Sequence, residues 1–313
     1  MQKIASKEKL KSYRCGNFER NLNIMANNPE TYNEYLKRIN KVLVHIDHHL
    51  DEKLDLESLA GISNFSPFHF HRIIRAYLGE SLGSYIVRIR METAATLILY
   101  TPEPISEIAL RVGYDIPSSF NKAFIKHFGC PPTEFKNKHI SINPIKFLSM
   151  ETNSHEVKLK PAIKVIKPKN VVFIQSIGDY SGEGTARAWQ KISEFAKHKK
   201  LFGWKTEFIG VSHDDPHITE TEKLRYDACI TVTKDVSPEG EIGVRQIQGG
   251  RFAIFMHKGP YEYFQKTYDA IFRQWLPSSG HKLRSADCFE KYLNSPQNTK
   301  PENLKTEIYI PVE

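Results

Sequence analysis

Long uninterrupted apolar runs are missing from this 313-residue chain. No stretch approaches the roughly 18 consecutive apolar residues that a membrane-spanning helix requires. The first 24 residues are polar and basic, and they lack the apolar segment of a secretory signal. We therefore expect a cytoplasmic protein with no membrane partner.

Cysteine is scarce as well, and the few thiols lie far apart. No Cys-x-x-Cys pair and no zinc-finger spacing to histidine occurs, which argues against a disulfide framework or a structural zinc and favours buried reduced thiols. His45 and His49 stand one helical turn apart, but no Glu follows His45 and no third ligand is evident. We expect neither a metal nor a cofactor. The four cysteines are Cys15, Cys130, Cys229 and Cys288.

Positive charge, in contrast, is in excess, with 44 Lys and Arg against 36 Asp and Glu. The net charge of +8 suggests a polyanionic partner. Residues 31–139 are nearly neutral, because 13 Lys and Arg stand against 12 Asp and Glu. Within them, residues 66–90 hold four Arg and one Glu. Such local asymmetry favours phosphate binding more than the total charge does.

Helical periodicity covers residues 31–139. Apolar spacing over residues 35–50 predicts a first helix, and Asp55 is placed to cap a short second one. Asn64 tolerates the left-handed conformation of a tight turn. Ser66-Pro67 then opens a further helix, so the pattern is typical of a helix-turn-helix unit. Its buried stripe is predicted to consist of Phe70, Ile73, Ile74 and Tyr77.

The same pattern recurs about 50 residues later. Asn64 corresponds to Gly113 at an offset of 49, and Phe70 corresponds to Phe120 at an offset of 50, which indicates an internal duplication. Residues 82–99 read as one helix between the copies, about 27 Å long at about 1.5 Å per residue. Two recognition helices separated on this scale would enter successive major grooves, which lie about 34 Å apart.

Five motifs occur in order in this half: Phe65–Arg72 (FSPFHFHR), Gly79–Arg90 (GESLGSYIVRIR), Ile105–Tyr114 (ISEIALRVGY), Phe120–Phe124 (FNKAF) and Phe128–Phe135 (FGCPPTEF). They resemble the DNA-binding domain of the AraC/XylS family over about residues 35–138. The resemblance implies promoter or operator DNA and RNA polymerase as partners. It also implies that outward side chains of the two second helices contact bases. Those positions are Phe68, His71, Arg72 and Arg75 in the first copy, and Ser118, Asn121 and Lys122 in the second.

The chemistry of these side chains suits base contact. Arg can bond guanine bidentately, Asn can bond adenine, and an aromatic edge can contact a thymine methyl. Pro117 departs from the family pattern because a polar side chain often reaches DNA at that place, so we expect weaker readout by the second copy. In the simpler interpretation, outward Arg and Lys side chains on these helices are only solvated.

Residues 140–160 read as a linker, and residues 161–313 mix strand and helix. These residues are also duplicated. Val171–Tyr180 parallels Phe252–Tyr261 at an offset of 81, and Leu224–Val232 parallels Leu304–Val312 at an offset of 80. Each half is predicted to be strand–helix–strand–strand, with a cleft between the halves, where ligands commonly bind.

The predicted fold is therefore multidomain. A polar extension at residues 1–30, expected to be disordered, precedes an all-α double helix-turn-helix domain over residues 31–139. The linker follows, and residues 161–313 form an α+β domain made of two duplicated strand–helix–strand–strand halves.

Three motifs carry a second resemblance: Gly259–Tyr261 (GPY), Cys288–Pro296 (CFEKYLNSP) and Thr306–Val312 (TEIYIPV). They resemble the GyrI-like effector-binding domain over about residues 160–313. In related multidrug-sensing proteins a carboxylate at the floor of an aromatic pocket binds bulky, often cationic, compounds. The matching carboxylate here is Glu290. A partly desolvated carboxylate gains most from a cation that brings its own apolar surface. The predicted effector-binding residues are Glu290, Glu307, Tyr309, Tyr261 and Trp189.

Simpler interpretations exist for this set as well. Glu290 could be an exposed strand residue paired with a Lys, and Tyr261 and Trp189 could be ordinary core aromatics. Strand alternation places Glu290 on one face with Cys288 and Tyr292.

The sequence thus predicts a transcription regulator that binds specific DNA and responds to a small, aromatic or cationic effector, without enzymatic activity. The alternative is a C-terminal hydrolase of reactive small molecules fused to a DNA-binding module, with Glu290 and Tyr261 or Tyr309 as its acid–base pair. A third interpretation is a constitutive regulator whose C-terminal domain is empty. Turnover separates the first two, because a sensor returns its ligand unchanged.

Overall fold

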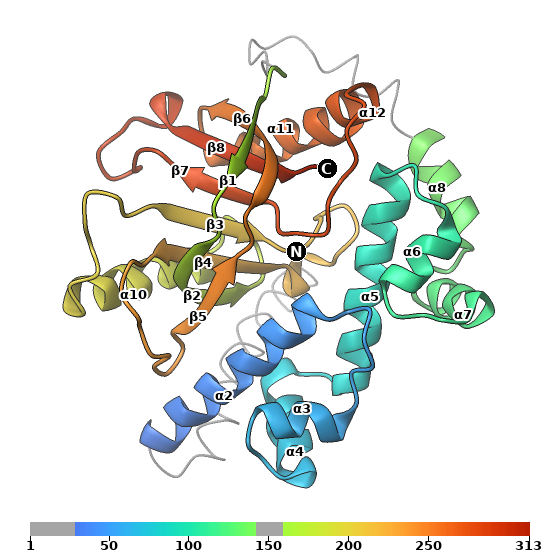
Figure 1. Ribbon diagram of the computed structural model, residues 1–313, viewed down its shortest axis with the longest axis horizontal. Coiled ribbons are helices and arrows are strands. Elements are labelled where there is room, and N and C mark those ends of the chain that lie inside the picture. The colour runs from blue at the N-terminus through green and yellow to red at the C-terminus, as the bar shows by residue number, and fades with distance from the viewer. Residues whose placement is uncertain (1–28, 142–158) are drawn as a thin grey trace, which may run out of the picture. The chain divides into compact units, whose positions relative to one another are not determined.

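A computed structural model of the chain describes residues 29–141 and 159–313 (Figure 1). These residues form two compact units. One runs up to Arg90 and takes in Pro238–Gly243, and the other consists of Met91–Ser237 and Val244–Glu313. Residues 1–28 of the predicted extension and most of the predicted linker lie outside the described residues. Pro29 and Glu30, which the prediction placed in the extension, instead begin the first described helix. Within the described ranges, no helix is long and apolar enough to cross a membrane.

The first helix-turn-helix copy forms as predicted. The carboxylate of Asp55 accepts a hydrogen bond from the backbone N–H of Ser58 (2.8 Å), and Asn64 adopts a left-handed φ of 52°. Ser66 caps the following helix, and Phe70, Ile73 and Ile74 are buried in a core shared with the first half of the next helix. The helices of this copy are α2 (Pro29–His48), α3 (Leu56–Ile62), α4 (Pro67–Leu78) and α5 (Leu82–Tyr100).

The second copy repeats this arrangement around the second half of α5. Gly113 supplies the turn with φ 79°, and Phe120 and Phe124 are buried. One difference separates the copies: Ile116 stands at the N-cap of the second recognition helix, and no side chain caps that helix. The helices are α6 (Ile105–Arg111), α7 (Pro117–Phe128) and α8 (Pro132–Ser141).

The C-terminal part is built on one eight-stranded sheet with the order β1-β6-β8-β7-β3-β4-β2-β5. From β1 to β2 in this order, each strand is antiparallel to its neighbour. The strands are β1 (Ala162–Ile166), β2 (Lys169–Ile177), β3 (Phe208–Ser212), β4 (Arg225–Thr231), β5 (Gly243–Ile247), β6 (Gly250–Lys258), β7 (Phe289–Tyr292) and β8 (Lys305–Pro311).

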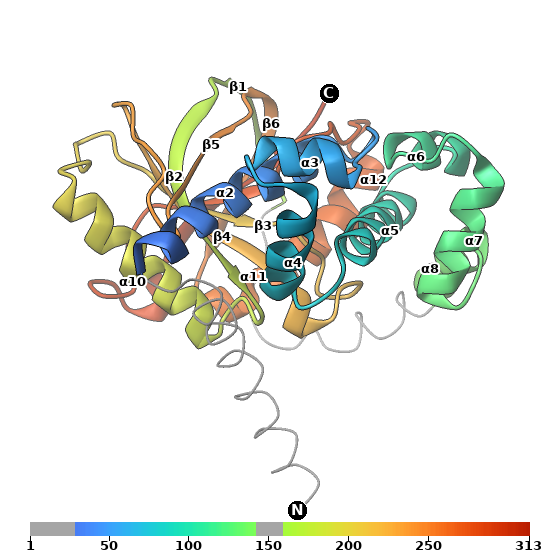
Figure 2. The ribbon, with the colours of Figure 1, turned by 90° about the horizontal axis from the view of Figure 1, so that it is seen from below.

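Helices from the two halves cover one face of this sheet. α10 (Glu183–His198) packs on β2 and β4 (Figure 2). The second half contributes Ile271, Tyr268 and Trp275, which pack on Phe255 and Ile308 of β6 and β8. The remaining helical segments are α11 (Phe264–Ala270), a π-helical turn (Ile271–Trp275), α12 (Leu276–Ser278) and the 3-10 turns Thr221–Lys223, Tyr261–Tyr263 and Pro301–Asn303.

The duplication predicted from the sequence is confirmed, because the halves read β2-α10-β3-β4 and β6-α11-β7-β8. The short strands β1 and β5, which lie at the two edges of the sheet, were not predicted. The halves join through β3 and β7, where Glu290 lies opposite Gly210. This pairing places Glu290 at the centre of the sheet.

Candidate functional site

Two sets of residues from the sequence stand out in the structure: the outer faces of α4 and α7, and the surroundings of Glu290. On α4 and α7, the buried side chains are aromatic and aliphatic residues of the core. The opposite faces are exposed, and Phe68 is 75 % exposed. The exposed residues include all seven predicted DNA contacts: Phe68, His71, Arg72, Arg75, Ser118, Asn121 and Lys122.

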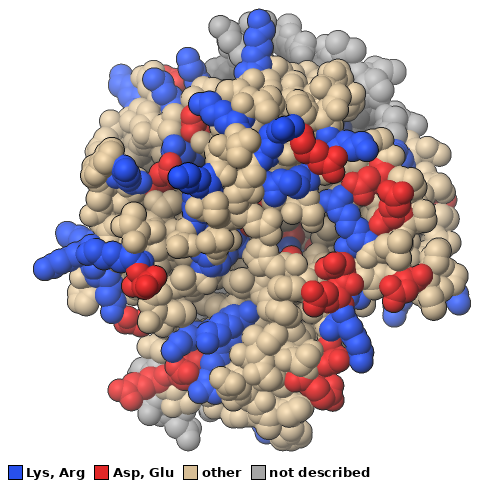
Figure 3. Space-filling model, in the orientation of Figure 1, with Lys and Arg blue, Asp and Glu red and all other residues tan. Residues whose placement is uncertain are grey.

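The charge on these two helices has a single sign. Neither Pro67–Leu78 nor Pro117–Phe128 contains an Asp or Glu. The guanidinium of Arg72 lies 5.9 Å from the ring centroid of Phe68, one helical turn away. Over the whole face drawn in Figure 3, Lys and Arg side chains are interspersed with Asp and Glu side chains. A helix face without Asp or Glu favours phosphate binding more than a surface of mixed charge does.

Glu290 is the most unusual carboxylate of the sheet domain. Its side chain is almost fully buried, at 1 % exposure. The oxygen Oε1 accepts hydrogen bonds from the hydroxyls of Tyr268 (2.5 Å) and Ser212 (3.0 Å). The oxygen Oε2 is buried and has no hydrogen-bond partner among the described residues. This burial excludes the simpler interpretation of Glu290 as an exposed strand residue.

Burial raises the pKa of Glu290 to about 7, although the hydrogen bonds from Tyr268 and Ser212 act in the opposite direction. A carboxylate with such a pKa is partly ionised at neutral pH. Its unpartnered oxygen offers a hydrogen-bond acceptor and a negative charge to any ligand that reaches it.

Aromatic side chains surround this carboxylate on the same face of the sheet. The hydroxyls of Tyr226 and Tyr292 lie 2.8 Å apart, and the indole N–H of Trp189 donates to the Tyr226 hydroxyl (3.2 Å). The ring of Tyr292 also packs against Trp189 and Tyr261, with centroids 5.5 and 5.3 Å away. Trp189, Tyr261 and Tyr292 are only half-buried, so their rings retain surface for a ligand.

A glycine makes room for these polar groups. A Cβ at Gly210 would lie 2.9 Å from Glu290 Oε2 and 2.7 Å from the Tyr292 hydroxyl, and still closer to the Tyr226 hydroxyl. Any larger residue at this position would force the carboxylate and both phenols to move. Gly210 therefore lets the three oxygens converge on one point of the sheet.

Two predicted effector residues lie elsewhere. Phe289 pairs with Tyr309 and Glu290 pairs with Ile308, so Tyr309 and Glu290 face opposite sides of the sheet. Glu307 shares the side of Tyr309, whose hydroxyl donates to it (2.8 Å), and it lies 3.7 Å from the Lys291 ammonium. The structure thus brings Glu290, Tyr261 and Trp189 together and separates Glu307 and Tyr309 from them.

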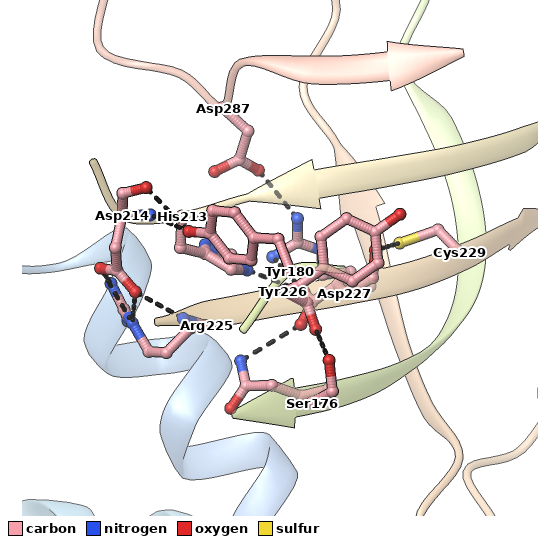
Figure 4. A network of polar contacts seen from close by, with 11 residues as sticks. Ser176, Tyr180, His213, Asp214, Arg225, Tyr226, Asp227, Cys229 and Asp287 are labelled. Atoms are coloured by element: carbon pink, nitrogen blue, oxygen red, sulfur yellow. Dashed lines mark hydrogen bonds and ion pairs between the residues drawn. The ribbon is translucent and has the colours of Figure 1, made fainter. Parts of the chain in front are cut away.

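A buried polar network borders the carboxylate site (Figure 4). Arg225 forms a bidentate ion pair with Asp214 (2.7 to 3.2 Å). Tyr180 donates to the backbone carbonyl of Asp214 (2.7 Å), which fixes the loop after β3. Among the described residues, no group of three or more His, Cys, Asp and Glu side chains is arranged to hold a metal ion.

Asp227 lies at the second node of this network. It contacts His213 (3.0 Å) and the guanidinium of Arg245 (3.2 Å), which also reaches Asp287 (3.1 Å). Burial alone would raise the pKa of Asp227, but the charges of His213 and Arg245 outweigh it and lower the pKa to about 2. Asp227 is therefore ionised at physiological pH, as a paired structural charge.

Sequence reasoning missed four residues of the carboxylate site, Tyr268, Ser212, Tyr226 and Gly210, and it placed Tyr292 on the face of Glu290 without assigning it to the site. Tyr268 reads as one more apolar position of an amphipathic helix, and Ser212 reads as the end of a strand. A tyrosine on a buried helical stripe was the only available signal, since a buried phenol usually needs a polar partner.

Comparison with protein families agrees with both halves of this description. Residues 59–138 match a helix-turn-helix domain of the AraC type, and residues 159–313 match the GyrI-like small molecule binding domain. The two matched segments contain α4, α7 and Glu290.

Three relatives of this chain are named as transcriptional regulators. The chain is 34 % identical over 110 residues to the probable transcriptional regulator YgiV of Escherichia coli K12, a match that covers 34 % of the chain and 68 % of YgiV. It is 24 % identical to the transcriptional regulator Rob of Salmonella typhimurium over 88 % of the chain and 97 % of Rob. It is 36 % identical over 102 residues to the HTH-type transcriptional regulator YbfP of Bacillus subtilis, covering 33 % of the chain and 35 % of YbfP.

Proposed function

Because the chain belongs to the family of transcriptional regulators that join an AraC-type helix-turn-helix domain to a GyrI-like small-molecule binding domain, we propose how each domain does its part. The outer faces of α4 and α7 bind two blocks of one operator. An aromatic cation binds at Glu290 and changes the affinity for that operator. RNA polymerase is the partner through which the bound regulator acts on transcription.

The DNA part rests on the exposed, acid-free outer faces of α4 and α7. Selection of bound sequences from a random duplex pool, with the full-length protein at physiological salt, tests it. Two enriched blocks about one helical turn apart would support a monomer that reads two grooves. No enrichment above the input pool would contradict the proposal.

Arg72→Ala is expected to lower the affinity for the selected operator by about 1–3 kcal/mol, roughly fivefold to 150-fold, because a base contact is lost. Titration of a labelled operator measures this loss. Lys37→Ala is the matched control, since Lys37 pairs with Glu34 on α2 (3.6 Å). Equal effects of both variants, or unchanged affinity for Arg72→Ala, would remove Arg72 from the reading set.

The effector part rests on one observation: a buried carboxylate with an unpartnered oxygen among half-buried aromatic rings. A cation with an aromatic body would satisfy that oxygen and cover the rings of Trp189, Tyr261 and Tyr292. Cation–π contact contributes about 2 kcal/mol or more in such desolvated surroundings. The Glu307 side chain, already hydrogen-bonded on the other face, is not part of this site.

Cation binding is expected to strengthen as the pH rises. Glu290 has a pKa of about 7, so the carboxyl is neutral below this value and charged above it. Calorimetric titration with tetraphenylphosphonium, which has no titratable group, should show affinity rising between pH 6 and 8 (about one unit either side of the pKa). Triphenylphosphine oxide, a neutral aromatic, should not share this rise. Parallel pH profiles for both compounds would count against the assignment.

A hydrolase remains the second candidate because of one contact. The Tyr268 hydroxyl lies 2.5 Å from a carboxyl group whose pKa is about 7, a combination suited to general acid–base chemistry. Mass spectrometry of candidate ligands after incubation with the protein separates the two functions. Recovery of every ligand unchanged supports the sensor, whereas a product that disappears in Glu290→Gln supports the hydrolase.

A further inference from the structure

Each recognition helix begins with one large, exposed apolar side chain. On α4 this is Phe68, at 75 % exposure, and at the N-cap of α7 it is Ile116, at 60 % exposure. Both stand at the end of a recognition helix that enters the major groove in helix-turn-helix proteins. Phe68 belongs to the base contacts predicted from the sequence, whereas Ile116 does not.

The position of Ile116 makes its side chain unusual. At an offset of 50 it corresponds to Ser66, whose hydroxyl caps α4 by accepting from the backbone N–H of His69. Ile116 has the extended backbone of an N-cap residue (φ −111°, ψ 112°) and offers no acceptor. Ser, Thr, Asp and Asn are strongly preferred at this place and Ile is among the poorest choices. The second copy therefore forgoes a stabilising cap and exposes an apolar group instead.

We propose that Ile116 is a specificity-determining residue that contacts the C5 methyl group of a thymine in the second block of the operator. Apolar side chains distinguish bases in the major groove through this methyl group, which only thymine carries there. Pro117 next to Ile116 supplies no hydrogen-bond donor, so these two positions present only apolar surface, and the polar contact predicted for Ser118 begins one residue further along α7. This inference rests on the proposed function.

Replacement of thymine by uracil tests the contact, because it removes the methyl group and leaves every hydrogen-bonding group of the base in place. In the selected operator, each thymine is replaced singly, and affinity is measured for the full-length protein. For the unmodified protein, at least one uracil in the second block should weaken binding by about fourfold, the effect of losing one buried methyl-sized group.

Three variants assign that effect. Ile116→Ser should abolish the difference between thymine and uracil at this position, and it should raise the melting temperature because a cap is restored. Phe68→Ser should leave the affinity difference between thymine and uracil at that position of the second block unchanged. Leu110→Ser, which changes an exposed apolar residue of α6 (54 % exposed), should keep it as well.

The outcomes separate the inference from the proposed function. If each uracil replacement changes the operator affinity of Ile116→Ser as it changes that of the unmodified protein, the role of Ile116 is overturned, although specific DNA binding is not. The role of Ile116 is also overturned if no uracil in the second block weakens binding by the unmodified protein. Failure of the full-length protein to select any operator would overturn the proposed function itself, and this inference with it.

Discussion

Glu290→Gln is expected to stabilise the ligand-free protein by up to about 3 kcal/mol at pH 8. In the folded protein the pKa of Glu290 is about 7, against its ordinary value of 4.5. Between these values the folded protein holds a proton that the unfolded chain has released, so stability falls as the pH rises. A difference of about two and a half pKa values corresponds to about 3 kcal/mol at about 1.4 kcal/mol each. Glutamine keeps an oxygen for Tyr268 and Ser212 but carries no charge.

Urea unfolding followed by tryptophan fluorescence measures this gain. All three tryptophans, Trp189, Trp204 and Trp275, lie in the C-terminal domain, so the signal reports on that domain. The gain should vanish below about pH 4.5, where the carboxyl is neutral in both states. Glu307→Gln is the matched control and should show no gain, because Glu307 pairs with Lys291. A Glu290→Gln variant that is less stable at pH 8 would contradict the account of Glu290 as a destabilising buried charge.

The same substitution links stability to function. Groups that destabilise the folded protein are often retained at functional sites, so a buried charge that lowers stability this much points to a function for that charge. We therefore expect Glu290→Gln to lose affinity for an aromatic cation by roughly tenfold to a hundredfold, the effect of about 1.5–3 kcal/mol for a charged hydrogen bond. Neutral aromatic ligands should lose much less.

Arg225→Met is expected to destabilise the C-terminal domain by about 3–5 kcal/mol, the usual effect of removing one partner of a buried ion pair. Only 5 % of the Arg225 side chain and 3 % of the Asp214 side chain are exposed. Burial raises the pKa of Asp214, and the Arg225 charge more than offsets it, so the pKa lies below its ordinary value. Without Arg225, the Asp214 carboxylate stays buried with its charge uncompensated.

The double variant Arg225→Met with Asp214→Leu provides the control, since replacing a whole buried pair by apolar residues is often neutral. It should recover most of the lost stability in the same urea experiment. A loss below about 1 kcal/mol for the single variant would contradict the inferred role of the pair. The ion pair also matters for the carboxylate site. Tyr180 holds the backbone of Asp214, which follows two residues after Ser212, and Ser212 donates to Glu290.

Local sequence signals predicted much of the fold. Asp55 and Ser66 as caps, Asn64 and Gly113 as turns, and the strand–helix–strand–strand repeat all follow from residues close together in the chain. Each of these features depends on hydrogen bonds within a few residues or on a short periodicity, so a single stretch of sequence contains the information.

The carboxylate site was only partly predictable, because long-range pairing decides it. Glu290 lies opposite Gly210 through the pairing of β7 with β3, some 80 residues apart in the sequence. That pairing, together with α11, brings Ser212 and Tyr268 to the carboxylate, and no periodicity within β7 indicates either residue. The prediction that Glu307 and Tyr309 share a site with Glu290 was wrong for the same reason. Alternation shows which residues of one strand share a face, but it does not show which faces of two different strands coincide.

Regulation of DNA binding from the Glu290 site is best tested through the affinity of the full-length protein for its selected operator. This affinity is measured with and without saturating tetraphenylphosphonium, for the unmodified protein and for Glu290→Gln. We expect a change of about fivefold or more for the unmodified protein, the usual scale of coupling between two sites. We expect little or no change for Glu290→Gln. Equal operator affinity with and without the cation, although the cation is shown to bind at Glu290, would contradict the claim that this carboxylate site regulates DNA binding.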